Sequence, residues 1–245
     1  MLKLMDLLKE GVQDKGIFKA VFMAGGPGSG KSYIASQIFG IPEVGGANIS
    51  VDGLKSVNTD TEFVFLLKKY GFDPKFLDQY PEGQFDQPGG LRDLAKDLTK
   101  ARKKGYMDGK LGMIIDGTGS KFPKIKKMKK ELEAQGYDCY MVFVETSLEV
   151  AQKRNQERSR VLDPNIVKKS WETTRKNLGG YKSIFKGNFA LVNNDSFLNA
   201  KEAKHKFGGL VKKYANKWAN SPIKNPIGQK WVKDQMKLKK VGIKK

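Results

Sequence analysis

A glycine-rich segment constrains this chain more than any other stretch of its 245 residues. It fits the pattern G-x-x-x-x-G-K-[ST], with the residues Gly25, Gly26, Pro27, Gly28, Ser29, Gly30, Lys31 and Ser32. Glycines at such a turn let backbone N–H groups point at phosphate oxygens, and the N-terminus of a following helix adds partial positive charge. In this pattern the lysine reaches the β- and γ-phosphates and the last hydroxyl holds Mg²⁺. The segment therefore predicts a phosphate-binding loop.

The residues on both sides of the loop support this interpretation. The run Phe18–Ala24 has strand character and leads directly into the loop, and the pattern Lys31–Phe39 that follows is helical. A phosphate-binding loop requires this strand-loop-helix setting. The alternative, a glycine-rich turn beside a chance Lys-Ser pair, leaves both flanks unexplained.

Strand and helix signals alternate along the rest of the chain. Further apolar runs with strand character cover residues 48–51, 111–115, 138–144 and 189–192. Helical patterns separate these runs, and such alternation is typical of a parallel sheet with right-handed crossovers. We therefore expect an α/β fold, a P-loop NTPase-type three-layer sandwich with a parallel five-stranded sheet. Ligands of such sheets bind at the carboxyl ends of the strands.

The expected organisation has three parts. Residues 1–16 form an N-terminal amphipathic helix, residues 17–198 form the phosphate-loop domain, and residues 199–245 form a basic helical extension. Within the domain, residues 72–90 are rich in aromatic residues, Pro and Gly, and they predict an insertion between the second and third strands. Residues 154–180 are expected to form a helical lid.

The charge of the chain indicates an anionic partner. The formal net charge is +20, and residues 201–245, with 14 lysines and two acidic residues, contribute +12 of it. An excess of this size attracts polyanions, nucleic acid first, although a solubilising lysine-rich surface explains it equally well.

The cysteine content and the hydropathy of the chain indicate which cellular compartment to expect. The single cysteine, Cys139, excludes an internal disulfide, and with one histidine, His205, a Cys/His metal cluster is impossible. The expected setting is the reducing cytoplasm. No apolar run approaches the length of a membrane span, so no membrane partner is expected.

Three constellations suggest phosphoryl-transfer chemistry. Asp52 follows the predicted strand 48–51, where a carboxylate can accept the proton of an attacking hydroxyl; an Asx turn before Gly53 is the alternative. Asp116 ends an apolar strand and can bind Mg²⁺ through water, or else cap a turn. The third constellation is a set of lid arginines that can neutralise charge on the transferred group, or form a solvated helix end: Arg154, Arg158 and Arg160.

The order of these motifs resembles the P-loop kinases that include polynucleotide 5′-hydroxyl kinases and zeta toxins. The segment Asn48-Ile49-x-x-Asp52-x-x-Lys55 is similar to the part of polynucleotide kinases that carries the catalytic Asp and a basic acceptor-phosphate ligand. The triplet Asp116-Gly117-Thr118 resembles their Asp-Thr-Asn motif and fits the acidic-Gly-Thr arrangement of zeta toxins better. The stretch Arg154-Asn155-x-x-Arg158 resembles the lid segment. The resemblance covers roughly residues 17–195.

The resemblance implies a mechanism and its ligands. Lys31, Ser32 and the loop glycines would hold ATP and Mg²⁺, with Asp116 on the metal side. Asp52 would act as general base, and Lys55 and Thr118 would contact the acceptor. Arg158, with Arg154 or Arg160, would clamp the phosphoryl group.

The expected activity is transfer of the γ-phosphoryl group of ATP to a hydroxyl of a nucleotide or a nucleic-acid 5′ end. Two alternatives stay open. One is a zeta-toxin-like kinase of sugar nucleotides, in which the 72–90 insertion covers the acceptor. The other is a nucleic-acid-binding ATPase or assembly factor that uses the basic C-terminal region.

Overall fold

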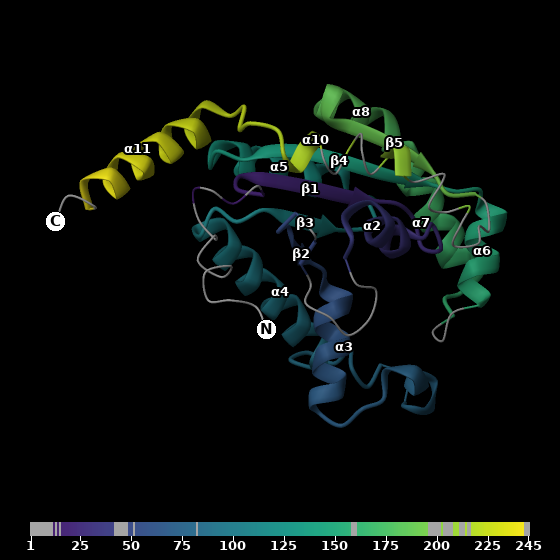
Figure 1. The fold of residues 1–245 in the computed structure, drawn as a ribbon. Helices are drawn as coiled ribbons and strands as arrows, with labels where there is room; N and C mark the ends of the chain where they lie inside the picture. The colour runs from purple at the N-terminus through teal and green to yellow at the C-terminus, as the bar shows by residue number, and fades with distance from the viewer. Residues whose placement is uncertain are drawn as a thin grey trace.

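The computed structural model describes residues 12, 14, 16–41, 49–50, 52–81, 83–157, 161–195, 202, 208–210, 214 and 217–242. Its centre is a sheet of five parallel strands in the order β2-β3-β1-β4-β5 (Figure 1). The strands are β1 (Lys19–Ala24), β2 (Lys55–Val57), β3 (Met113–Asp116), β4 (Asp138–Glu145) and β5 (Phe189–Asn193). The α/β class and the five-stranded parallel sheet are thus confirmed. The helix expected over residues 1–16 lies outside the described residues except for Val12, Asp14 and Gly16.

Helices cover both faces of this sheet and complete three layers. The described helices are α2 (Lys31–Phe39), α3 (Thr59–Lys69), α4 (Leu91–Asp108), α5 (Phe122–Ala134), α6 (Leu148–Gln156), α7 (Pro164–Lys176), α8 (Leu178–Phe185), α10 (Lys217–Ala219) and α11 (Pro226–Gly242). Short 3-10 turns occupy Pro74–Gln79 (η1) and Lys186–Asn188 (η2). None of the described helices is long and apolar enough to cross a membrane.

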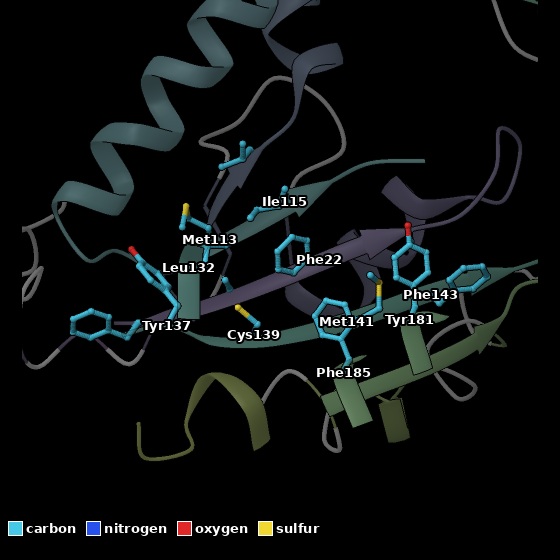
Figure 2. Close-up of a cluster of buried hydrophobic side chains, with 14 of the residues drawn as sticks. Phe22, Met113, Ile115, Leu132, Tyr137, Cys139, Met141, Phe143, Tyr181 and Phe185 are labelled. Carbon is cyan, nitrogen blue, oxygen red and sulfur yellow. The ribbon is translucent and has the colours of Figure 1, made fainter. Parts of the chain in front are cut away.

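Alternate residues of the buried strands belong to two separate hydrophobic cores, one on each face of the sheet. On one face Val21, Met23 and Val142 pack with Ile34 and Ile38 of α2. On the other face Phe22, Met141 and Phe143 pack with Leu132 of α5 and with Tyr181 and Phe185 of α8 (Figure 2). Because side chains alternate across a strand, the near-continuous apolar sequence of β1 and β4 is what burial on both faces requires.

The second strand differs from its sequence-based prediction. The predicted strand covered residues 48–51, of which Ile49 and Ser50 are described, and Ile49 forms only an isolated antiparallel bridge with Lys55. The parallel strand is Lys55–Val57, which pairs with Met113–Ile115 of β3. The prediction is wrong because Gly53, at a φ of 80°, and the Ser50 hydroxyl form a turn that redirects the chain before the sheet.

Residues between β2 and β3 form a folded lobe that includes α3, η1 and α4 and lies below the sheet in Figure 1. Inside the segment expected as an insertion, the rings of Phe72, Tyr80 and Phe85 make edge-to-face contacts with one another, and Phe85 also meets Phe63 of α3. Buried Glu62 of α3 pairs with Arg102 of α4 at 3.2 Å. The 72–90 segment is therefore the packed tip of a helical lobe.

A buried polar knot fixes the C-terminal region at the amino end of the strands. Lys19 and Asp138 form an ion pair of 2.8 Å, with side chains only 1% and 7% exposed. The Asp138 carboxylate also accepts hydrogen bonds from the backbone N–H groups of Lys224 and Asn225. Beyond this knot Trp231 of α11 meets Phe18 edge to face at 5.4 Å, and α11 extends away from the body (Figure 1).

Asp138→Ala should lower the free energy of unfolding by about 3–5 kcal/mol, because it leaves the Lys19 ammonium buried without its partner. Thermal unfolding with Asp97→Ala, at an exposed ion pair of α4, as the matched control measures the effect. A chain of this length should lose about 2–4 °C in Tm for each kcal/mol. Equal Tm values for the two variants would contradict the role assigned to the knot.

Candidate functional site

The phosphate loop occupies the carboxyl end of β1, and its backbone needs glycine at two positions. Gly28 and Gly30 adopt φ angles of 75° and 78°, in the left-handed region. A Cβ at Gly28 would also overlap the carbonyl oxygen of Ala151, and one at Gly30 would overlap the Asn194 amide. Gly30 caps α2 without a side-chain bond, which leaves the first N–H groups of that helix directed at the loop. This is a cradle for an anion.

The two polar side chains of the motif lie at the start of α2. The Lys31 ammonium donates to the carbonyl oxygens of Gly25 and Gly26 at 2.8 and 3.4 Å, so it lies across the loop. Ser32 is exposed in the first helical turn. The Ser29 hydroxyl is buried and has no hydrogen-bond partner among the described residues. Lys31 thus provides a cation, and Ser29 and Ser32 provide hydroxyl groups, of the kinds that bind a phosphate chain and its metal ion.

Asp116 ends β3 beside the phosphate loop. One carboxylate oxygen accepts a hydrogen bond of 2.9 Å from the Asn58 amide, and Oδ1 is buried without a partner in the described chain. Burial raises the pKa of this carboxyl group; the Lys31 ammonium opposes the rise, and the Asp60 carboxylate adds to it. An unsatisfied buried carboxylate oxygen is costly, so its presence here points to a ligand such as a hydrated cation.

Sequence reasoning missed Asn58 and Asp60, which follow β2 directly. Asn58 caps α3, accepting a 2.8 Å hydrogen bond from the Asp60 backbone N–H, while its amide donates to Asp116. The exposed Asp60 carboxylate lies close enough to raise the pKa of Asp116. The signal was available: Asn58-Thr59-Asp60 follows the short segment Leu54 to Val57, which has an apolar residue at each end, as a helix cap follows a strand.

Asp52 and Lys55 lie elsewhere. Asp52 precedes β2 and Lys55 begins it, so both lie at the amino end of the parallel strands. The expectation that Asp52 lies at the carboxyl end of a strand is therefore wrong. The Asp52 backbone N–H donates to the Ser50 hydroxyl in a turn, and Lys55 is buried, 3.7 Å from Asp14. The structure therefore does not bring these two residues together with Lys31.

The expected lid arginines are only partly described. Arg154 of α6 lies next to the loop, where it donates a 2.7 Å hydrogen bond to the carbonyl oxygen of Asn194, and burial lowers its pKa. The Asn194 amide in turn donates to the Ser29 carbonyl oxygen, which ties the end of β5 to the loop. Arg158 and Arg160 lie outside the described residues.

Helix α7 covers the other side of the loop. Its residue Trp171 contacts Gly26 and donates a 2.7 Å hydrogen bond to the Thr146 carbonyl oxygen. Arg175 stacks on the Trp171 ring at 5.0 Å and lies 3.4 Å from Glu145. A narrow slot beside the loop is lined by these residues together with Ser29. Arg175 is therefore a second described arginine at this edge.

Thr118 belongs to a short loop that follows Asp116 and is held by two helices. Its backbone carbonyl oxygen accepts hydrogen bonds from Gly25 of the phosphate loop and from the Thr174 hydroxyl. The Tyr181 hydroxyl and the Asn177 amide donate to Gly119. The exposed Thr118 side chain is thus presented on a fixed backbone next to Asp116.

Asp116→Asn should raise the Tm of the ligand-free protein. A carboxyl group whose folded pKa is raised binds its proton more tightly in the native state, so stability falls as pH rises from about 4 through the folded pKa. The side-chain amide that replaces the Asp116 carboxyl group does not ionise, so stability is not lost in this pH range. Its oxygen still accepts the hydrogen bond from Asn58. Tm measured against pH for wild type, D116N and the exposed control D97N tests this; a parallel decline in wild type and D116N would contradict it.

These features define a P-loop NTPase-type α/β domain: a parallel sheet in the order β2-β3-β1-β4-β5, a phosphate loop after β1 and a carboxylate at the end of β3. The chain belongs to the AAA domain family, whose model matches residues 21–180. No curated protein sequence matches the chain significantly.

Several solved structures are similar to this chain at low sequence identity. The AvrRxo1-ORF1:-ORF2 complex with ATP gives a TM-score of 0.55 at 16% identity, covering 76% of this chain and 57% of that one. The PezAT chromosomal toxin–antitoxin system of Streptococcus pneumoniae gives 0.49 at 14% identity, covering 95% and 90%. A gluconokinase from Sinorhizobium meliloti gives 0.45 at 14% identity, covering 84% and 99%. This chain therefore spans little more than half of the AvrRxo1 chain.

Proposed function

We propose that this chain is a kinase that transfers the γ-phosphoryl group of ATP to a hydroxyl of a small acceptor or a nucleic-acid end. The observation that carries the proposal is the meeting of Lys31, Asp116 and Asp60 at the carboxyl edge of the sheet, beside a complete phosphate loop. Phosphoryl transfer needs a phosphate cradle, a metal-side carboxylate and a group that orients the acceptor hydroxyl. The loop with Lys31, Asp116 and Asp60 would meet these three requirements in turn.

The residues fit ATP and Mg²⁺. The glycine backbone and Lys31 would bind the phosphates, and Ser32 and the unpaired oxygen of Asp116 would hold the metal. Mg²⁺, when bound, neutralises charge on the β- and γ-phosphate oxygens. The solved AvrRxo1 complex holds ATP, which agrees with this assignment.

Asp60 replaces Asp52 as the proposed general base. Its exposed carboxylate stands at the edge where an acceptor would meet the γ-phosphate, and it can accept the proton of the attacking hydroxyl. Arg154 and Arg175 would supply positive charge beside the transferred group, as Arg158 and Arg160 would if the lid closes over it. Thr118 would contact the acceptor, whereas Lys55 has no place in this site.

The acceptor screen that tests the proposal uses γ-labelled ATP with 5′-hydroxyl DNA and RNA, nucleosides, nucleotides and UDP-sugars. We expect label in at least one acceptor. A nucleic-acid end supports the polynucleotide-kinase-like reading, and a UDP-sugar supports the zeta-toxin-like one. Release of inorganic phosphate without labelled acceptor would contradict both and favour a nucleic-acid-binding ATPase.

The basic helix α11 favours a polyanion-binding surface that is separate from the phosphate-loop site. It docks at the amino end of β1, a strand that spans about 20 Å, so nucleic acid held there is far from the phosphate loop. Lys230, Lys233 and Lys237 changed together to Gln should weaken binding of a DNA duplex and reduce the slope of log K against log salt by about 3. An unchanged slope would make the charge of α11 a solubilising feature. Deleting 221–245 is a poorer test, because it also removes Lys224 and Asn225 from the Asp138 knot.

A further inference from the structure

A pocket of about 260 Å³ lies between the carboxyl ends of β1 and β3 and the first turns of α5. It begins at Asp116 and the loop that follows, and ends at the lysines that open α5. Its lining includes Phe22, Ile115, Asp116, Lys121, Lys124, Ile125 and Met128. Binding sites for small molecules are of the order of 300 Å³ or larger, so this pocket has room for one small molecule or part of one.

The floor of the pocket is apolar. Phe22 and Ile115 come from neighbouring strands and belong to the core on this face of the sheet (Figure 2), and Ile125 and Met128 of α5 pack against the same core. An aliphatic and aromatic floor favours the body or ring of a ligand, because burying its apolar surface is favourable.

One end of the pocket is positively charged. Lys121 and Lys124 are exposed at the start of α5, and neither forms an ion pair with a described residue. By contrast Lys129, further along the same helix, pairs with Glu133. The first turn of α5 holds no acidic residue, and its cap makes no side-chain hydrogen bond. Two ammonium groups at an uncapped helix N-terminus suit a phosphate or a carboxylate.

A further lining group is the carboxyl group of Asp116, which also belongs to the proposed transfer site. Asp116 has an oxygen with no hydrogen-bond partner in the described chain, and the Asp60 carboxylate is close enough to act on the pKa of Asp116. In the proposed reaction the acceptor hydroxyl must lie beside Asp60 and Asp116, so a ligand spanning the pocket would place its hydroxyl here and its anion at the lysines.

We infer that the acceptor is a small molecule with a hydroxyl at one end, a phosphate or carboxylate at the other and an apolar or ring-shaped part between them. Lys121 and Lys124 bind the anionic group, and the floor residues bind the middle. This inference rests on the proposed function, since it names the acceptor class of that site, and it favours a metabolite over a nucleic-acid chain.

Methyl NMR of Ile125 and Met128 tests the inference without phosphoryl transfer. The phosphate loop is first filled with Mg²⁺ and a non-hydrolysable ATP analogue, so that added anions do not bind there. The probes are ribose 5-phosphate against ribose, glycerate against glycerol, and a short 5′-hydroxyl oligonucleotide. We expect saturable shifts for a charged small probe and at least about tenfold weaker binding of its neutral partner. The phosphate and carboxylate arms separate the two kinds of anionic group.

The matched variants are Lys121→Gln/Lys124→Gln and Lys126→Gln/Lys130→Gln. Both remove two charges from α5, but only the first pair lines the pocket. The first variant should bind the charged probe at least about tenfold more weakly, and the second should match wild type. Equal affinity in the two variants, equal binding of charged and neutral probes, a response to the oligonucleotide alone, or no response to any probe would overturn the inference. Because no turnover is measured, a filled pocket in a protein without transfer activity would count against the proposed kinase function alone.

Discussion

Asp60→Asn should lower phosphoryl transfer by about a hundredfold or more while ATP affinity stays within about twofold of wild type. The amide keeps the size of the side chain and the cap at the start of α3, which is made by Asn58 and the backbone N–H of residue 60. It removes the carboxylate that would take the proton of the acceptor hydroxyl. Initial rates with the acceptor found by the screen, measured at saturating ATP, give the effect.

Asp52→Asn is the control for this prediction. Asp52 lies in the turn before β2, at the amino end of the sheet, so its conversion should leave the transfer rate near that of wild type. If D52N loses transfer and D60N retains it, the assignment of the base to the carboxyl edge is wrong.

Lys31→Ala should remove measurable transfer, a loss of about a thousandfold, and should also weaken ATP binding. The Lys31 ammonium lies across the phosphate loop, and it opposes the rise that burial causes in the pKa of Asp116. Transfer assays and a binding titration with ATP and Mg²⁺ measure the two losses separately.

Lys130→Ala, on the exposed side of α5, is the matched control and should behave as wild type. Retained transfer in K31A would exclude the phosphate loop from the reaction. A K31A variant that loses ATP binding together with thermal stability would instead show a folding defect, so Tm is recorded for both variants.

Local sequence signals predict the fold where several of them agree. The phosphate loop has its motif, a strand before it and a helix after it, and all three are found in the structure. The strands β1, β3 and β4 are largely buried apolar runs, and β5 is a short apolar run with alternating buried and exposed residues. The predicted limits of all four differ from the observed ones by no more than two residues. Trp231 and Val232 of the basic C-terminal extension also pack against the core.

The site was less predictable because it depends on which end of a strand a residue occupies. Residues 48–51 and Lys55–Val57 both look like short strands, and choosing the first placed Asp52 at the wrong end of the sheet. The turn at Gly53 decides between them, through contacts with Ser50 and Asp14 that the local pattern does not reveal. Asp60 was missed for the same reason.

Contacts between distant segments could not be predicted from motifs. Arg154 was expected to face the phosphoryl group, yet its guanidinium also holds the Asn194 carbonyl oxygen, 40 residues away. The Lys19–Asp138 pair and the pocket between β3 and α5 likewise depend on tertiary packing. The sequence shows the charge of Lys121 and Lys124, and only the fold shows that both line one pocket with Asp116.

The central claim, that the phosphate loop serves transfer to an acceptor, is tested most directly by the fate of the γ-phosphate. Wild type is incubated with γ-labelled ATP, Mg²⁺ and the acceptor from the screen, and labelled acceptor and labelled inorganic phosphate are measured in the same sample. The account predicts that most label reaches the acceptor and that K31A forms neither product. Label found only as inorganic phosphate, and still lost in K31A, would identify an ATPase and contradict the account.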